Sequence, residues 1–97
     1  MTQKGKAVLL RLYVAGEAPN SVRAIANLQA ILRKYWKGDH ELEIVNIIEE
    51  PSHALNDGVL VTPCLLRLSP PPVVTLIGDL SEEDKVLAVL GLKGNTP

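Results

Sequence analysis

The stretch that most constrains the fold is KAVLLRLYV, at residues 6–14. Apolar side chains recur at every second position along it, and this period of two is typical of a β-strand. One face of the strand would carry Val8, Leu10, Leu12 and Val14. The opposite face also has apolar residues, Leu9 and Tyr13 beside Arg11, so we expect this face to be covered at least in part.

Residues 20–37 have the pattern of an amphipathic helix, because apolar side chains recur there every three to four positions. The expected apolar stripe consists of Val22, Ile25, Leu28, Ile31 or Leu32, and Tyr35 or Trp36. Pro19 suits the first turn of a helix, and Gly38 suits its end. Residues 41–48 (ELEIVNII) then form a second candidate strand. Strand, helix and strand in this order predict a βαβ unit with two parallel strands.

The second half of the chain is less clearly patterned. Residues 51–56 predict a short helix, and residues 73–77 predict a short strand. Between them, residues 59–68 (VLVTPCLLRL) are nearly all apolar, and such a run fits a buried strand or a buried helix. A last helix is expected from Ser81, whose hydroxyl suits an N-terminal cap, to Gly91, which suits a helix end.

The expected elements follow the order β-α-β-α-β-β-α, which is the order of the thioredoxin-like α/β fold. In that fold a loop proline, often after a cis peptide bond, directly precedes the third strand. Thr62 and Pro63 stand at this place. We expect one domain over residues 1–97, with frayed ends at 1–6 and 92–97, because most domains hold about 50–250 residues.

Composition argues against several classes of protein. Ten basic and eleven acidic residues leave a net charge of −1, which favours neither nucleic acid nor an anionic membrane as a partner. No apolar run approaches the roughly 20 residues that span a bilayer, and the start of the chain does not resemble a signal peptide. We therefore expect a cytoplasmic protein. The single cysteine cannot form an internal disulfide.

The residues that carry chemistry do not form a catalytic pattern. A thiol oxidoreductase of this fold needs a cysteine in the first strand-to-helix turn, but residues 15–21 (AGEAPNS) contain none. We expect Cys64 to be a small buried core residue. His40 and His53 lack the spacing of metal ligands, and no glycine-rich phosphate loop occurs. The residues therefore predict a protein that is not an enzyme, holds no cofactor or metal, and acts by binding another protein.

Several short blocks of the sequence resemble the KaiB family of circadian clock proteins. They are LYVAG at 12–16, PNSVRA at 19–24, TP at 62–63, PPPV at 70–73, IGDLS at 77–81 and KVL at 85–87. The resemblance implies a non-enzymatic regulator that binds a KaiC-like ATPase, in a circadian clock or in a clock-derived timing or stress-response system. KaiA and a SasA-like kinase pathway are further partners that it implies.

The resemblance also implies a metamorphic protein, with two alternative orders of its elements. The thioredoxin-like order belongs to a monomer that binds the partner. The second order, β-α-β-β-α-α-β, belongs to a ground state that assembles as a homo-oligomer, a dimer or tetramer, and we expect a crystal to favour it. Such a switch is feasible where two packings of one chain differ by on the order of a few kcal/mol.

The resemblance implies roles for two sets of residues. Those that match partner-binding positions of the family are Arg11, Arg23 and Arg67. Those that match its fold-switch segment are Pro63, Pro70, Pro71, Pro72, Gly78 and Asp79. Relatives usually carry lysine where this chain has Glu43, Glu49 and Gly58, which weakens the expectation that KaiA is a partner.

The residues also admit plainer interpretations. On composition alone, Arg11 and Arg23 fit ordinary solvated positions, and the three consecutive prolines fit a rigid turn as well as a switching role. The alternative function is a thioredoxin-like scaffold or sensor domain for another signalling protein. A thiol oxidoreductase is much less favoured, because the reactive cysteine is missing.

Overall fold

A computed structural model describes residues 8–36 and 38–92. In chain order its elements are β1 (Val8–Val14), α1 (Pro19–Tyr35), β2 (His40–Asn46), α2 (Pro51–Asn56), β3 (Cys64–Ser69), β4 (Val74–Ile77) and α3 (Glu83–Leu90). This is the predicted thioredoxin-like order, and the preference of a crystal for the second order stays a prediction. Residues 1–6 and 93–97 of the expected frayed ends lie outside the described residues.

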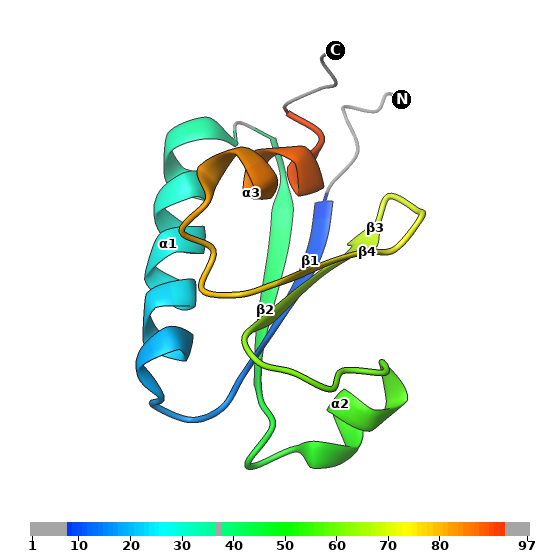
Figure 1. Ribbon diagram of the computed structural model, residues 1–97. Helices are drawn as coiled ribbons and strands as arrows, with labels where there is room; N and C mark the ends of the chain where they lie inside the picture. The colour runs from blue at the N-terminus through cyan, green and yellow to red at the C-terminus, as the bar shows by residue number, and fades with distance from the viewer. Residues whose placement is uncertain (1–7, 37, 93–97) are drawn as a thin grey trace.

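The four strands form one sheet in the order β2-β1-β3-β4. β1 and β2 are parallel, as predicted. β3 pairs antiparallel with β1, and β4 pairs antiparallel with β3. α1 and α3 pack on one face of this sheet, and α2 packs near one end of the other face (Figure 1). None of the described helices has the length and apolarity that crossing a membrane requires.

β1 is buried on both faces. Its side chains in the larger core cluster, shared with α1 and α3, are Val8, Leu10, Leu12 and Val14. On the other face, a smaller cluster consists of Tyr13, Val45, Ala54, Cys64 and Leu66. The prediction that both faces are covered is confirmed. Because side chains alternate along a strand, Arg11 lies on the same face as Tyr13, toward α2.

α1 buries a different stripe at its start from the one expected. Its buried side chains are Ser21, Ala24, Leu28, Ile31 and Leu32. Val22 is 52% exposed, so its assignment to the apolar stripe is wrong. Ser21 faces inward because its hydroxyl accepts a hydrogen bond from the backbone N–H of Ala15, at 3.0 Å, in the turn that follows β1. The helix ends at Tyr35, before Gly38, because Trp36 is extended.

Only the second part of residues 59–68 is a strand. β3 begins at Cys64, and residues 59–63 form a loop. Proline has no N–H for a sheet ladder, so the strand begins beyond Pro63. β3 and β4 form an antiparallel hairpin, and the loop between the two strands contains the three consecutive prolines. Among the described residues, three peptide bonds are cis, namely Thr62–Pro63, Ser69–Pro70 and Pro71–Pro72.

α3 begins one residue later than a cap at Ser81 predicts. Its N-terminal cap is Glu82, so the expectation that Ser81 caps this helix is wrong. The backbone N–H of Ser81 instead donates to Oδ1 of Asp79 at 3.0 Å, which closes a tight turn ahead of the helix. Gly91 ends α3, as predicted, with a φ of +80° that glycine adopts without steric cost.

Candidate partner-binding site

Arg11 is held by two carboxylates on the α2 side of the sheet. Its Nε donates to Oε1 of Glu43, on the neighbouring strand β2, at 2.8 Å. Its Nη1 donates to Oδ2 of Asp57, just after α2, also at 2.8 Å. The Arg11 and Asp57 side chains are only about a quarter exposed, at 25% and 24%. These carboxylates raise the pKa of Arg11, Asp57 more than Glu43, so the guanidinium stays protonated.

Tyr13 belongs to the same cluster, because it lies two residues after Arg11 on the same face of β1. Its hydroxyl lies 2.5 Å from Oδ2 of Asp57 and 3.0 Å from the carbonyl oxygen of His53, in α2. Burial raises the pKa of Tyr13 to about 12, and the hydrogen bond to Asp57 adds to this rise. The pKa of Asp57 is lowered, first by the hydrogen bond from Tyr13 and then by Arg11. Asp57 is therefore ionised beside a neutral phenol and a cation.

Arg23 and Asp79, one from each predicted set, lie together. Nε of Arg23, in α1, is 3.4 Å from Oδ2 of Asp79, and its Nη2 also donates to Oδ1 of Asn20. Nδ2 of Asn27 donates to the backbone carbonyl of Asp79 at 2.9 Å. Hydrogen bonds from Ser81, and then Arg23, lower the pKa of Asp79. The turn before α3 is thus tied to α1 by side chains.

This turn contains a residue in an unfavourable conformation. Leu80 has a φ of +64°, in the left-handed region that side chains other than glycine and asparagine rarely adopt. Its side chain is 4% exposed and belongs to the larger core cluster. Burial of the leucine therefore holds a strained backbone in place.

Arg67 binds backbone carbonyls inside the second half of the chain. Its Nη1 donates to the carbonyl of Val89, near the end of α3, at 2.8 Å. Its Nη2 donates to the carbonyl of Pro72 at 3.0 Å. A cation suits the C-terminal end of a helix, where carbonyl groups lack partners. Elsewhere in the predicted switch segment, the N–H of Gly78 donates to the carbonyl of Pro63 at 3.0 Å.

The three arginines do not form one patch. Leu10 pairs with Arg67 and Arg11 pairs with Leu66, so Arg11 and Arg67 point to opposite faces of the sheet. Arg23 lies on a helix, with its side chain 57% exposed. Each arginine instead contacts another part of the same chain. The structure thus brings the predicted binding set and the predicted switch set into contact at two points, Arg23 with Asp79 and Arg67 with Pro72.

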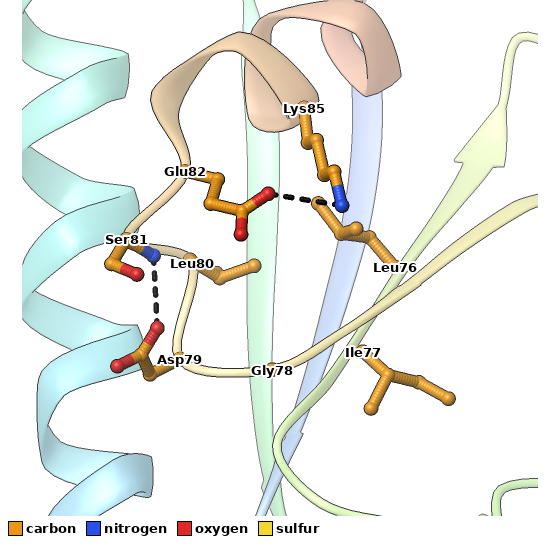
Figure 2. Close-up of a pocket in the computed structure, with 8 residues that line it drawn as sticks. All are labelled: Leu76, Ile77, Gly78, Asp79, Leu80, Ser81, Glu82 and Lys85. Carbon is orange, nitrogen blue, oxygen red and sulfur yellow. Dashed lines mark hydrogen bonds and ion pairs between the residues drawn. The ribbon is translucent and has the colours of Figure 1, made fainter.

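A small hollow lies beside the switch segment (Figure 2). It has a volume of about 110 Å³ and is lined by residues 76–82 and Lys85. The ammonium group of Lys85 points toward Glu82, at 2.9 Å from its carboxylate. Sites for small molecules usually have a volume of about 300–1,000 Å³. The hollow is therefore too small for an ordinary small-molecule substrate.

Cys64, His40 and His53, the other residues considered for chemistry, are not among those that line this hollow. Cys64 is buried, as predicted, at 3% exposed, and burial raises the pKa of its thiol. His40 begins β2 on the surface. Nδ1 of His53 is 3.4 Å from the carboxylate of Glu50. Over residues 8–36 and 38–92, no cluster of histidine, cysteine and acidic side chains is suited to a metal ion.

Asp57 and Asn27 are the polar residues that the sequence alone did not single out. Asp57 stands between Asn56 and Gly58, where it reads as part of an ordinary turn. Asn27 reads as one of several polar side chains on the outer face of a helix. Nothing local distinguishes either one, because their partners lie 46 and 52 residues away along the chain.

The model of the KaiB domain matches residues 11–92 of this chain. The chain belongs to the KaiB family. KaiB relatives are 47% identical over 87 residues in Thermosynechococcus vestitus and 45% identical in Prochlorococcus marinus strain MIT 9312. These alignments cover 90% of this chain and 81% and 83% of the relatives, each named circadian clock oscillator protein KaiB. These relatives are clock proteins, as the resemblance predicted.

Solved structures confirm the fold of this KaiB-family chain. The N-terminal domain of SasA from Synechococcus elongatus matches with a TM-score of 0.76 and 21% identity, over 100% of this chain and 95% of that domain. Deadhead, a germline thioredoxin of Drosophila melanogaster, matches with a TM-score of 0.71 and 12% identity, over 88% of this chain and 79% of its own. The thioredoxin-like prediction is therefore confirmed.

Proposed function

We propose that this chain is a non-enzymatic clock-type regulator that binds a KaiC-type ATPase by switching its fold. The observation that carries the proposal is the KaiB-family match over residues 11–92, together with an identity of 44–47% to KaiB clock proteins. The thioredoxin-like order is the state that binds the partner. The first strand-to-helix turn, residues 15–21, has no cysteine, which supports a binding role over thiol chemistry.

The contacts of the second half support a change of fold. Long-range side-chain hydrogen bonds to the turn before α3 come from Arg23 and Asn27, and that turn contains the strained Leu80. Leu60, Val61 and Ile77 are 90%, 52% and 56% exposed. A second packing, or an oligomer, gains free energy by covering such apolar side chains. Pro63, Pro70, Pro71, Pro72, Gly78 and Asp79 are the residues we propose to rearrange.

The three arginines are proposed to serve binding, either by contact with the partner or by holding the binding state together, and not as one patch. Arg23 is the most available to a partner, because 57% of its side chain is exposed and its pair with Asp79 is long. Such exposed pairs contribute little to stability and are exchanged readily. A carboxylate of the ATPase that replaces Asp79 would keep the charge of Arg23 balanced.

Co-elution with a KaiC-type ATPase from the same organism tests the proposal. The chain is incubated with the ATPase for minutes to a day, in ATP, in ADP and without nucleotide, and then run on a sizing column. We expect a complex that forms slowly, because only the minor state binds. Each protein run alone is the control. Absence of a complex under every nucleotide condition after the longest incubation contradicts the proposal.

The physiological setting and the wider partners belong to the same proposal. We propose a cytoplasmic protein that works either in a circadian clock or in a clock-derived timing or stress-response system. Genes beside the coding sequence discriminate between the two: a KaiA gene favours the clock, and a lone KaiC-type gene favours the other. Adding KaiA to the preformed complex tests directly whether it is captured.

A sensor or scaffold role for another signalling protein is the second candidate. The fold match to the SasA N-terminal domain, with a TM-score of 0.76, favours it. In this case a pull-down from the native cell extract would be dominated by a protein other than a KaiC-type ATPase. The purified ATPase would then fail to co-elute with the chain.

A further inference from the structure

Arg11 is turned mainly toward partners inside the molecule. Its Nε and Nη1 are both engaged at 2.8 Å, by Glu43 and Asp57, and three quarters of its side chain is buried. A charged group that is partly buried and paired is costly to separate from its partners. A partner carboxylate that binds Nε or Nη1 of Arg11 would therefore have to displace Glu43 or Asp57 first.

The contact with Asp57 joins two distant parts of the chain. Arg11 and Tyr13 lie on the central strand, and both donate to the same oxygen, Oδ2 of Asp57, which follows α2. α2 has six residues, of which only Ala54 is buried, and Leu55 is 73% exposed. Because so little apolar surface attaches α2 to the sheet, this polar cluster bears much of its docking.

We infer that Arg11 is a positioning residue: through Asp57 it holds α2 on the sheet and so favours the thioredoxin-like order, and it does not contact the partner. The inference rests on the proposed function, since it explains how the binding state is selected. In the second order a strand, and not α2, follows β2. The docking of α2 through Asp57 therefore belongs to the thioredoxin-like order, in which α2 is a helix.

Glu43 provides a matched control, because its carboxylate binds the same guanidinium without attaching α2. It lies on β2, beside Arg11 in the parallel register, and its side chain is 46% exposed. Glu43→Gln therefore removes one negative charge next to Arg11 and leaves the Arg11–Asp57 connection intact. If the cluster acts through α2, Asp57→Asn should change the affinity for the ATPase and the ratio of the two orders, whereas Glu43→Gln should hardly change either.

The affinity for the ATPase distinguishes a positioning role of Arg11 from direct contact with the partner, because the two roles predict different effects of Asp57→Asn. If Arg11 acts through Asp57, then Arg11→Met and Asp57→Asn each weaken the apparent affinity about tenfold, or about 1.4 kcal/mol. The double variant is then no weaker than either single one, because both changes break one connection. If Arg11 instead contacts the partner, Asp57→Asn frees it and leaves binding unchanged or tighter, while Arg11→Met still weakens it. That second pattern overturns the inference.

A measurement without the ATPase keeps the inference separate from the proposed function. Two-dimensional NMR of the intact chain reports the ratio of the two orders through separate signals. We expect Asp57→Asn and Arg11→Met to lower the thioredoxin-like fraction by a similar factor, and Glu43→Gln to leave it within about twofold. Equal fractions in all variants overturn the inference. If the wild-type chain binds no ATPase, the proposed function fails while this comparison still stands.

Tyr13→Phe tests the same cluster in case Asp57→Asn does not fold. It keeps the buried ring and removes only the hydroxyl that binds Asp57. We expect the same direction of change as for Asp57→Asn, with a smaller fold-change, since the contact between Arg11 and Asp57 remains. Should Asp57→Asn unfold, an unchanged state ratio in Tyr13→Phe and in Arg11→Met overturns the inference.

Discussion

The hydroxyl of Tyr13 lies 2.5 Å from Oδ2 of Asp57, so the central strand and the turn after α2 share a hydrogen bond across 44 residues of chain. The ring of Tyr13 is fully buried, and Asp57 is ionised beside it. A neutral phenol is the form that can donate to a carboxylate. The contact therefore depends on the protonation of two groups that titrate at opposite ends of the pH scale.

At alkaline pH, Tyr13 should cause a loss of stability. Its pKa is about 12 in the folded chain against 10 ordinarily, so its contribution is complete below pH 10 and disappears as pH rises through 12. We expect the wild type to lose up to about 2 kcal/mol more than Tyr13→Phe over this range. Urea unfolding followed by circular dichroism measures this. Tyr35→Phe is the control and keeps the wild-type loss; an identical loss in Tyr13→Phe contradicts the prediction.

At acid pH, Asp57 should contribute in the opposite sense. Its pKa is lowered in the folded chain, so its stabilisation is present above about pH 4, the ordinary value, and is lost as pH falls through the folded value. Asp57→Asn is expected to be less stable at pH 7 and to show a shallower fall below pH 4. Unfolding free energies from pH 2 to 7 test this. Part of the loss of stability at acid pH should remain in Asp57→Asn, because the pKa of Asp79 is lowered in the folded chain too.

Replacing Arg67 should destabilise the junction of the hairpin and α3. Arg67→Met keeps much of the apolar stem but removes both hydrogen bonds, to Val89 and to Pro72. We expect a loss of about 1–3 kcal/mol, since hydrogen bonds from charged groups are stronger than neutral ones. The urea midpoint measures the loss. Arg33→Met, at an exposed position in the last turn of α1, is the control and should change stability by less than about 0.5 kcal/mol.

Removing the side chain of Asn27 should loosen the turn that holds Leu80. Asn27→Ala deletes the hydrogen bond to the carbonyl of Asp79 while it improves the helix propensity of α1. We expect a net loss of about 1 kcal/mol and faster amide exchange at Leu80 and Ser81. Hydrogen exchange followed by NMR resolves these amides. Gln29→Ala, an exposed position of the same helix, should leave their exchange rates as they are.

Much of the fold is encoded in short-range patterns. The period of two in β1 predicted both its strand character and the two buried faces, and the three-to-four spacing predicted α1. The helix end at Gly91 and the loop proline before β3 also followed from single residues with restricted backbones. These properties are local, since alternation, helical spacing and proline geometry depend on neighbours within a few positions.

Other features depend on which elements meet. Ser21 is buried in place of the more apolar Val22 because its hydroxyl accepts a hydrogen bond from the backbone N–H of Ala15, after β1. The periodicity of the sequence does not reveal this partner. Residues 64–69 became a strand because β1 offers its free edge there, although their composition also suited a helix.

The candidate site divides in the same way. Motif resemblance identified Arg11, Arg23 and Arg67 as a set, and single positions in a sequence reveal nothing more about them. Only the packed chain pairs them with Asp57, Asp79 and Val89, which lie 46, 56 and 22 residues further on. Charge and hydrogen-bonding capacity belong to each side chain alone, but the energy of a contact belongs to a pair. Pairs so distant in the chain are formed by the sheet that brings them together.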